Sequence, residues 1–188
     1  MKQIKVAAKK NNIPIIHDDT LNYLLMLIQK NKCQKVLEIG TAIGYSAIAI
    51  AKANPNVKVI TIERDPDLYQ IALKNVKEKK LLERIQVICA DAKEVFLTET
   101  FDLIFIDAAK SSNQLFFEKF QHNLNDNGIM ITDNINFHGL LTADIQNRNL
   151  KQLVRKIQKF RRFLENNETF QTEFIDVGDG ISVSQRRI

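Results

Sequence analysis

Short apolar runs alternate with amphipathic stretches along almost the whole chain. The first runs are apolar nearly throughout, which is typical of parallel strands covered on both faces. The apolar runs predict strands at Lys35–Ile39, Val57–Ile62, Ile85–Cys89, Asp102–Ile106, Gly128–Thr132, Glu173–Val177 and Ile181–Gln185. The stretches with helical spacing predict helices at Tyr45–Ala53, Pro66–Lys79, Asn113–Asn123 and about Leu150–Glu165.

This order of elements predicts a doubly wound α/β fold with a mostly parallel sheet and helices on both faces. Asp65 and Pro66 form a strong helix start, as N-cap and first helical residue. The last two strands flank Gly178–Gly180, and so short a connection makes them an antiparallel hairpin. A dinucleotide-dependent dehydrogenase does not end in such a hairpin. With 188 residues and neither repeats nor a linker, residues 1–188 are expected to form a single domain.

Composition sets only broad limits on function. The formal net charge of +5 and pI of about 9.2 favour anionic partners such as nucleic acid, but a basic protein without such a partner fits equally well. Cys33 and Cys89 form no paired motif, so we expect neither a disulfide nor a zinc site. The lysine-rich start lacks the apolar core of a signal peptide, and no apolar run is long enough to span a membrane. We therefore expect a cytoplasmic protein with no membrane partner.

Three acids lie at the ends of consecutive predicted strands. Glu38 lies two residues before Gly40 in a G-x-x-x-G loop that ends at Gly44. An acid there would repel a pyrophosphate but suits the cationic amino-acid end of S-adenosylmethionine. Glu63 ends the second strand, where a carboxylate accepts ribose hydroxyls, and Asp91 follows the third, where it accepts from an adenine amino group. Any one of them alone fits a helix cap or solvated turn; together they favour a nucleoside cofactor.

Side chains with oxygen atoms that can bind a metal follow the fourth and fifth predicted strands. Asp107 follows one strand, and Asp133 and Asn134 follow the next. Carboxylate and amide oxygens that converge at one sheet edge favour Mg²⁺ or a similar divalent cation. Lys110 lies three residues after Asp107 and could act as general base. Taken singly, these residues also fit a helix cap, a polar turn and an ordinary surface lysine.

Four segments resemble one enzyme family, the catechol-type, cation-dependent O-methyltransferases of the class I, Rossmann-like fold. They are VLEIGTAIGYSAIAIA (Val36–Ala51), FDLIFIDAAK (Phe101–Lys110), ITDN (Ile131–Asn134) and VGDG (Val177–Gly180). The resemblance implies cofactor contacts from Glu38, Gly40, Ser46, Glu63, Asp91, Ala92 and Asp107. It also implies metal ligands at Asp107, Asp133 and Asn134, and catalytic roles for Lys110 and Asp107. Ile13–Ile15 resembles the family's strap over the cofactor.

The resemblance also bears on the substrate. The family's metal binds two adjacent substrate oxygens, as in catechols and in 5-hydroxyuracil. The sequence is most similar to the bacterial branch that methylates 5-hydroxyuridine at the tRNA wobble position, giving 5-methoxyuridine. A homodimer is implied as well, because relatives are commonly dimers. Ala109 departs from the acid that relatives often carry there, so substrate details are not transferred from them.

The predicted last helix supports an RNA partner independently. Between residues 148 and 162 basic residues occur without any acid, opposite an apolar stripe. Such a face could follow the phosphates of a tRNA anticodon stem-loop, although a merely solvated basic face has the same pattern. The expected RNA contacts are Arg148, Lys151, Arg155, Lys156 and Lys159. Phe137 and His138 could border the substrate, although Phe137 better fits the core and His138 an exposed loop. Two alternatives remain open: a small-molecule catechol or phenol methyltransferase, and a non-catalytic RNA-binding module.

Overall fold

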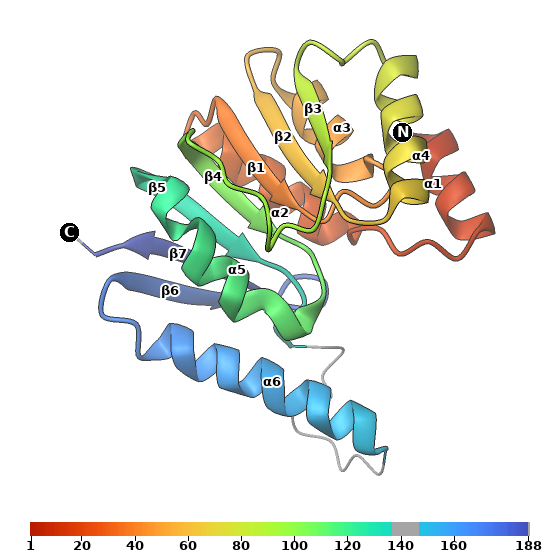
Figure 1. The fold of residues 1–188 in the computed structure, drawn as a ribbon. Coiled ribbons are helices and arrows are strands. Elements are labelled where there is room, and N and C mark those ends of the chain that lie inside the picture. The colour runs from red at the N-terminus through yellow and green to blue at the C-terminus, as the bar shows by residue number, and fades with distance from the viewer. Residues whose placement is uncertain (137–146, 188) are drawn as a thin grey trace.

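The computed structural model describes residues 1–136 and 147–187. Its centre is a seven-stranded sheet in the order β3-β2-β1-β4-β5-β7-β6 (Figure 1). The strands are β1 (Lys35–Ile39), β2 (Lys58–Glu63), β3 (Ile85–Cys89), β4 (Phe101–Ile106), β5 (Leu124–Thr132), β6 (Phe170–Ile175) and β7 (Ile181–Arg186). The helices are α1 (Lys2–Lys10), α2 (Asp18–Lys30), α3 (Tyr45–Ala53), α4 (Pro66–Glu78), α5 (Asn113–Phe120) and α6 (Arg148–Glu165), with 3₁₀ turns η1 (Lys110–Ser112) and η2 (Gln121–Asn123).

Alternate residues of each central strand face two separate apolar cores. On one face, Val36 and Phe105 pack with the helices α1 to α4; on the other, Leu37 and Ile104 pack with α5 and α6. Figure 1 shows these helix layers on opposite sides of the sheet. Because both faces are covered, the central strands are apolar almost throughout. Polar residues that function in the site must therefore lie at the strand ends.

Local signals explain where the helices begin. The Asp65 side chain accepts from the backbone N–H groups of Asp67 and Leu68, and Pro66 opens α4. At α6 the Asn147 side chain caps the helix by accepting from Leu150 N at 3.1 Å. The apolar face of α6 then packs on α5 through Phe160, whose ring meets Phe117 edge-on. None of the helices in the described ranges is long and apolar enough to cross a membrane.

The predicted sheet and its C-terminal antiparallel hairpin are confirmed: β5 pairs with β7 and β6 with β7 in antiparallel register. Some boundaries were wrong. β6 begins at Phe170, opposite Arg186, and β5 begins at Leu124. The predicted start of this strand at Gly128 instead lies within β5, close to the point where the register with β4 shifts. Helices α1 and α2 were not predicted. Phe137 and His138 lie outside the described residues.

Candidate active site

The loop after β1 requires glycine for steric reasons. Gly40 has φ +104°, and a Cβ there would stand 2.8 Å from the carbonyl carbon of Asp107 and closer still to its oxygen. Backbone hydrogen bonds fix this approach, from Asp107 N to Ile39 O at 2.9 Å and from Gly40 N to Ile62 O at 3.0 Å. The cofactor loop and the predicted metal-binding strand end are thus in direct backbone contact. Gly44, at φ +79°, then caps α3.

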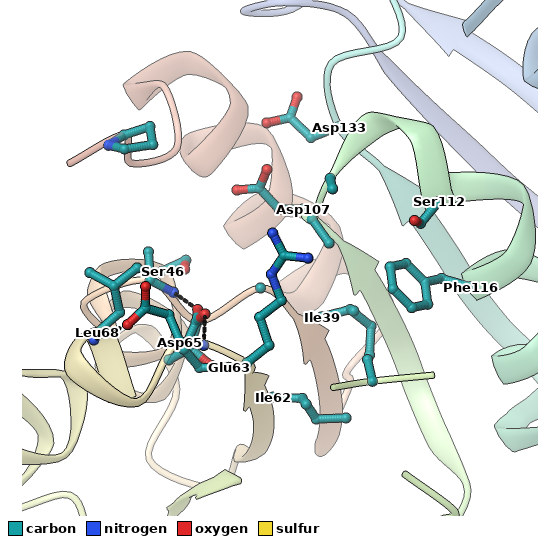
Figure 2. A pocket seen from close by; sticks show the side chains of 18 of the residues that line it. Ile39, Ser46, Ile62, Glu63, Asp65, Leu68, Asp107, Ser112, Phe116 and Asp133 are labelled. Atoms are coloured by element: carbon teal, nitrogen blue, oxygen red, sulfur yellow. Dashed lines mark hydrogen bonds between the residues drawn. The ribbon is translucent and has the colours of Figure 1, made fainter. Parts of the chain in front are cut away.

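Glu63 organises the same loop from the end of β2. Its Oε2 accepts from Ala42 N at 2.7 Å and its Oε1 from Asp65 N at 2.9 Å. Figure 2 shows Glu63 beside Asp65, Ser46 and Leu68 on one side of the cavity. A carboxylate has about four lone-pair sites, so two remain for ribose hydroxyls. The predicted role at the ribose fits this position.

Glu38 lies deeper than the sequence predicts. It is fully buried, it does not line the cavity, and its Oε2 accepts from the Thr61 hydroxyl at 2.6 Å. Its Oε1 has no hydrogen-bond partner among the described residues. Burial raises the pKa of Glu38 to about 7, and the nearby Glu63 carboxylate adds to the shift. Glu38 therefore supports the loop from beneath, through its bond to Thr61 of the neighbouring strand.

Asp91 and Ala92 lie in the cavity wall beyond β3, and Ala92 is buried. The Asp91 Oδ1 accepts from Lys93 N at 2.9 Å, so this carboxylate also stabilises its own turn. Asp91 can therefore stabilise this turn and contact a ligand at the same time. Its Oδ1 makes the bond in the turn, whereas its Oδ2 makes no such bond there. Ser46, in the first turn of α3, is buried and lines the same cavity.

The four residues predicted for metal binding and catalysis come together at the ends of β4 and β5. Asn134 donates from Nδ2 to Asp107 Oδ1 at 3.4 Å, and Asn134 N donates to Asp133 Oδ1 at 2.7 Å. Asn134 has a left-handed φ of +62°. Lys110, in η1, lines the same cavity. In Figure 2 the Asp107 and Asp133 side chains lie next to each other at one end of the cavity.

The electrostatics of this cluster fit a cation. Burial raises the pKa of Asp107, and the charge of Asp133 raises it further, while Lys110 opposes the shift. Burial likewise raises the pKa of Asp133, with Asp179 adding to the shift. Adjacent carboxylates that raise each other's pKa are stabilised in their charged form by a divalent cation. The donor set of two carboxylates and an amide is the hard-oxygen set that Mg²⁺ prefers.

Two cavity residues were missed as site residues. Asp179, in the turn between β6 and β7, is buried, and His17 Nε2 lies 3.5 Å from its Oδ2. Both line the cavity and both affect the pKa of Asp133. The VGDG segment contained the signal for Asp179. His17 precedes α2, and nothing near it in the chain indicates a partner at position 179.

These walls enclose a cavity of about 560 Å³ along the carboxyl edge of the sheet, which is a size suited to a nucleoside-sized ligand. Pro14 and Ile15 of the predicted strap line one side together with Ile16, whereas Ile13 does not line the cavity. Of the predicted cofactor and metal residues, all but Glu38 line this cavity. The predicted residues that line the cavity are Gly40, Ser46, Glu63, Asp91, Ala92, Asp107, Lys110, Asp133 and Asn134.

The predicted RNA contacts lie on the solvent face of α6. Their side chains are exposed, while Val154, Ile157, Phe160 and Leu164 on the opposite face of the helix are buried. They form the basic face of α6, which comprises Arg148, Lys151, Arg155, Lys156 and Lys159. Arg161 differs, because its guanidinium lies 4.2 Å from the ring centre of Phe174 and donates to Asn136.

This sheet order, with a ligand cavity at the carboxyl strand ends, defines the Rossmann-like class I methyltransferase fold. The family model for O-methyltransferases matches residues 1–187. The chain therefore belongs to this family of S-adenosylmethionine-dependent O-methyltransferases.

Individual relatives agree with the family match. A caffeoyl-CoA O-methyltransferase of Populus kitakamiensis is 25% identical over 99% of this chain and 86% of its own length. A catechol O-methyltransferase of Niastella koreensis is 32% identical over 60% of this chain and 54% of its own. Among solved structures, a candidate caffeoyl-CoA O-methyltransferase of Staphylococcus aureus has TM-score 0.94 and 33% identity, covering 99% of this chain and 91% of that one. A Bacillus cereus O-methyltransferase in complex with SAH has TM-score 0.85 and 24% identity, covering 99% and 90%.

Proposed function

We propose that this protein methylates one of two adjacent oxygens of its substrate in a reaction that depends on a divalent cation. The observation that carries the proposal is the convergence of Asp107, Asp133 and Asn134 with Lys110 at one end of the cavity. Asp107, Asp133 and Asn134 would hold the cation. The cation would bind the two adjacent substrate oxygens and make the substrate hydroxyl more acidic. The strap and the β2 and β3 ends would hold the methyl donor.

The residues of the chain then divide into binding and proton transfer. Glu63 accepts from the ribose hydroxyls and Asp91 from the adenine amino group. Lys110 Nζ accepts the proton of the substrate hydroxyl, so that this oxygen becomes the nucleophile. Bound S-adenosylmethionine would supply the methyl group, and the thioether would leave with the electron pair of the C–S bond. Orientation of the two reactants supplies most of the rate, because the methyl donor is already activated.

We further propose 5-hydroxyuridine at the wobble position of tRNA as the substrate, with the anticodon stem-loop as the partner. Its O4 carbonyl and O5 hydroxyl have the required adjacency. Support comes from the exposed basic face of α6, which carries no acid before Glu165 and could follow phosphates. A wobble base lies in a single-stranded loop and needs little unstacking to enter a cavity. A homodimer would extend the positive surface.

A small-molecule substrate is the second candidate, and the relatives favour it. Named relatives act on caffeoyl-CoA or catechol, which also present adjacent oxygens. A non-catalytic RNA-binding module is disfavoured, because the cluster of Asp107, Lys110, Asp133 and Asn134 is complete.

One experiment separates these candidates. Labelled S-adenosylmethionine is incubated with bulk tRNA that carries 5-hydroxyuridine and, in parallel, with catechol, each with Mg²⁺ and with a chelator. Mg²⁺-dependent label in tRNA supports the wobble-base proposal, and tRNA lacking 5-hydroxyuridine is the control. Label in catechol alone would replace it with the small-molecule function. Cofactor binding without any transfer would point to the RNA-binding module.

A further inference from the structure

The segment that leaves the metal cluster is held in place from two sides. Ile135 N donates to Gly180 O at 3.0 Å and Asn136 N to Asp179 O at 2.9 Å, so the β6–β7 turn holds its backbone. Gly180 permits this approach, because a Cβ there would stand 2.7 Å from the Cβ of Asn136. Asn134, whose φ is +62°, lies directly before this anchored segment.

The second hold comes from α6, through one side chain. Arg161 Nη1 donates to Asn136 Oδ1 at 2.8 Å, and Asn136 Nδ2 donates to Asp176 Oδ1 at 3.2 Å. The Asn136 amide is therefore fixed at both ends. Only one residue, Ile135, separates it from Asn134, so a rotation at Asn136 is transmitted to the Asn134 amide and to Asp133.

Arg161 is distinct from the basic residues around it. Its guanidinium lies 4.2 Å from the centre of the Phe174 ring, in a cation–π contact, and its side chain is only partly exposed. Arg162, its neighbour in sequence, is exposed. An arginine that stacks on an aromatic ring and bonds a loop amide has a defined direction, which a lysine does not reproduce.

We infer that Arg161 is a positioning residue for the divalent-cation site, acting through Asn136 on Asn134 and Asp133. The inference rests on the proposed function, because it takes that cluster to bind a cation. This role is separate from that of the exposed basic face of α6. Through Arg161, α6 would set the geometry of the cation site at the end of β5.

The test measures cation binding directly, by electron paramagnetic resonance titration of the metal-free protein with Mn²⁺. Arg161→Met keeps the contact with Phe174 but removes the donor, and its Mn²⁺ dissociation constant should rise about tenfold, which is typical when a partner of a metal ligand is lost. Arg161→Lys should recover part of the affinity. Arg162→Met is the matched control and should bind Mn²⁺ like the wild type.

A second variant covers the case in which Arg161→Met folds poorly. Asn136→Ala should weaken Mn²⁺ binding to a similar extent, and the double variant should be no weaker than either single one, because both remove the same link. Thermal unfolding separates the outcomes. A lowered melting temperature with unchanged Mn²⁺ affinity would make Arg161 merely structural and overturn the inference. If the wild type itself binds no Mn²⁺, the proposed cation site fails, which is a different result.

Discussion

Gly40 leaves room for the backbone of Asp107. A Cβ at residue 40 would stand 2.8 Å from the Asp107 carbonyl carbon, so a predicted cofactor residue and a predicted metal ligand share one steric constraint. The loops after β1 and β4 can approach each other only because residue 40 has no side chain. The backbone spacing between the ends of β1 and β4 is thereby fixed.

Gly40→Ala should therefore damage the cofactor site. The clash with Asp107 adds to the left-handed backbone strain, and we expect a loss of about 2–4 kcal/mol in the free energy of unfolding. S-adenosylmethionine binding, measured by calorimetry, should be lost. Gly44→Ala is the control: its φ is also positive, but its Cβ would have ordinary contacts at 3.5 Å, so only about 1 kcal/mol of strain is expected. Equal effects of the two substitutions would refute the steric argument.

Lys110→Met should reduce kcat by roughly 10²–10⁴-fold, the usual contribution of a general base. The affinity for S-adenosylmethionine should stay unchanged, because Lys110 lies at the metal-binding end of the cavity. Single-turnover methyl transfer and calorimetry measure the two quantities. Activity that stays within a few-fold of wild type would remove Lys110 from the proton transfer.

Removal of the cation should stop the reaction but leave cofactor binding intact. A chelator should abolish methyl transfer, and added Mg²⁺ should restore it in the wild type. Asp133→Asn should stay inactive even with excess Mg²⁺, since one ligand charge is lost. Asp126→Asn, an exposed carboxylate on the same strand, should behave like the wild type. Full activity in the chelator would contradict a cation-dependent mechanism.

Glu38 gives the protein a pH-dependent stability. Its pKa is raised by burial from 4.5 to about 7, so between these values the folded protein keeps a proton that the unfolded chain has released. The free energy of unfolding then falls as the pH rises through this window. Glu38→Gln removes this fall. In the cofactor-free protein, the free energy of unfolding of the variant minus that of the wild type should therefore increase by about 3 kcal/mol from pH 4.5 to 8. Urea denaturation measures it; parallel pH profiles would show that Glu38 ionises normally.

The basic face of α6 should matter for tRNA alone. Replacing Lys151 and Lys156 by Glu should lower kcat/KM for tRNA by about tenfold or more at low salt and reduce the slope of affinity against salt. Lys74→Glu with Lys77→Glu on α4, which packs on the other side of the sheet, is the charge-matched control. If both pairs slow tRNA methylation equally, the effect reflects net charge and not the face of α6.

The site residues at the strand ends could be predicted because polar side chains there interrupt the apolar runs. Asp107, Asp133 and Asn134 each follow a buried strand, and parallel strands bring such residues to one edge. Glu38 looked equivalent, but its depth depends on Thr61 of the neighbouring strand, a contact that only the register supplies. The spacing of acids thus located the site without giving the depth of each side chain.

The N-terminal helices show a different limit. The sequence of α2 does contain a helix pattern, since Leu21, Leu24 and Ile28 have helical spacing and are buried. α1 buries only Ile4 and Ala8 among exposed lysines, a pattern that also fits an unstructured tail. Its Lys5 is paired with Asp18 of α2. The pairing of His17 with Asp179 could not be predicted, because no local pattern joins the two ends of a chain.

That pairing constrains when the cavity can exist during synthesis. One wall holds His17 and another holds Asp179, and a Cβ on Gly178 would collide with the Thr20 hydroxyl of α2. The β6–β7 turn thus packs on the start of α2 at the end of a nearly chain-long loop. The cavity therefore cannot close on a nascent chain until the β6–β7 hairpin has emerged from the ribosome, however early β1 to β4 are made.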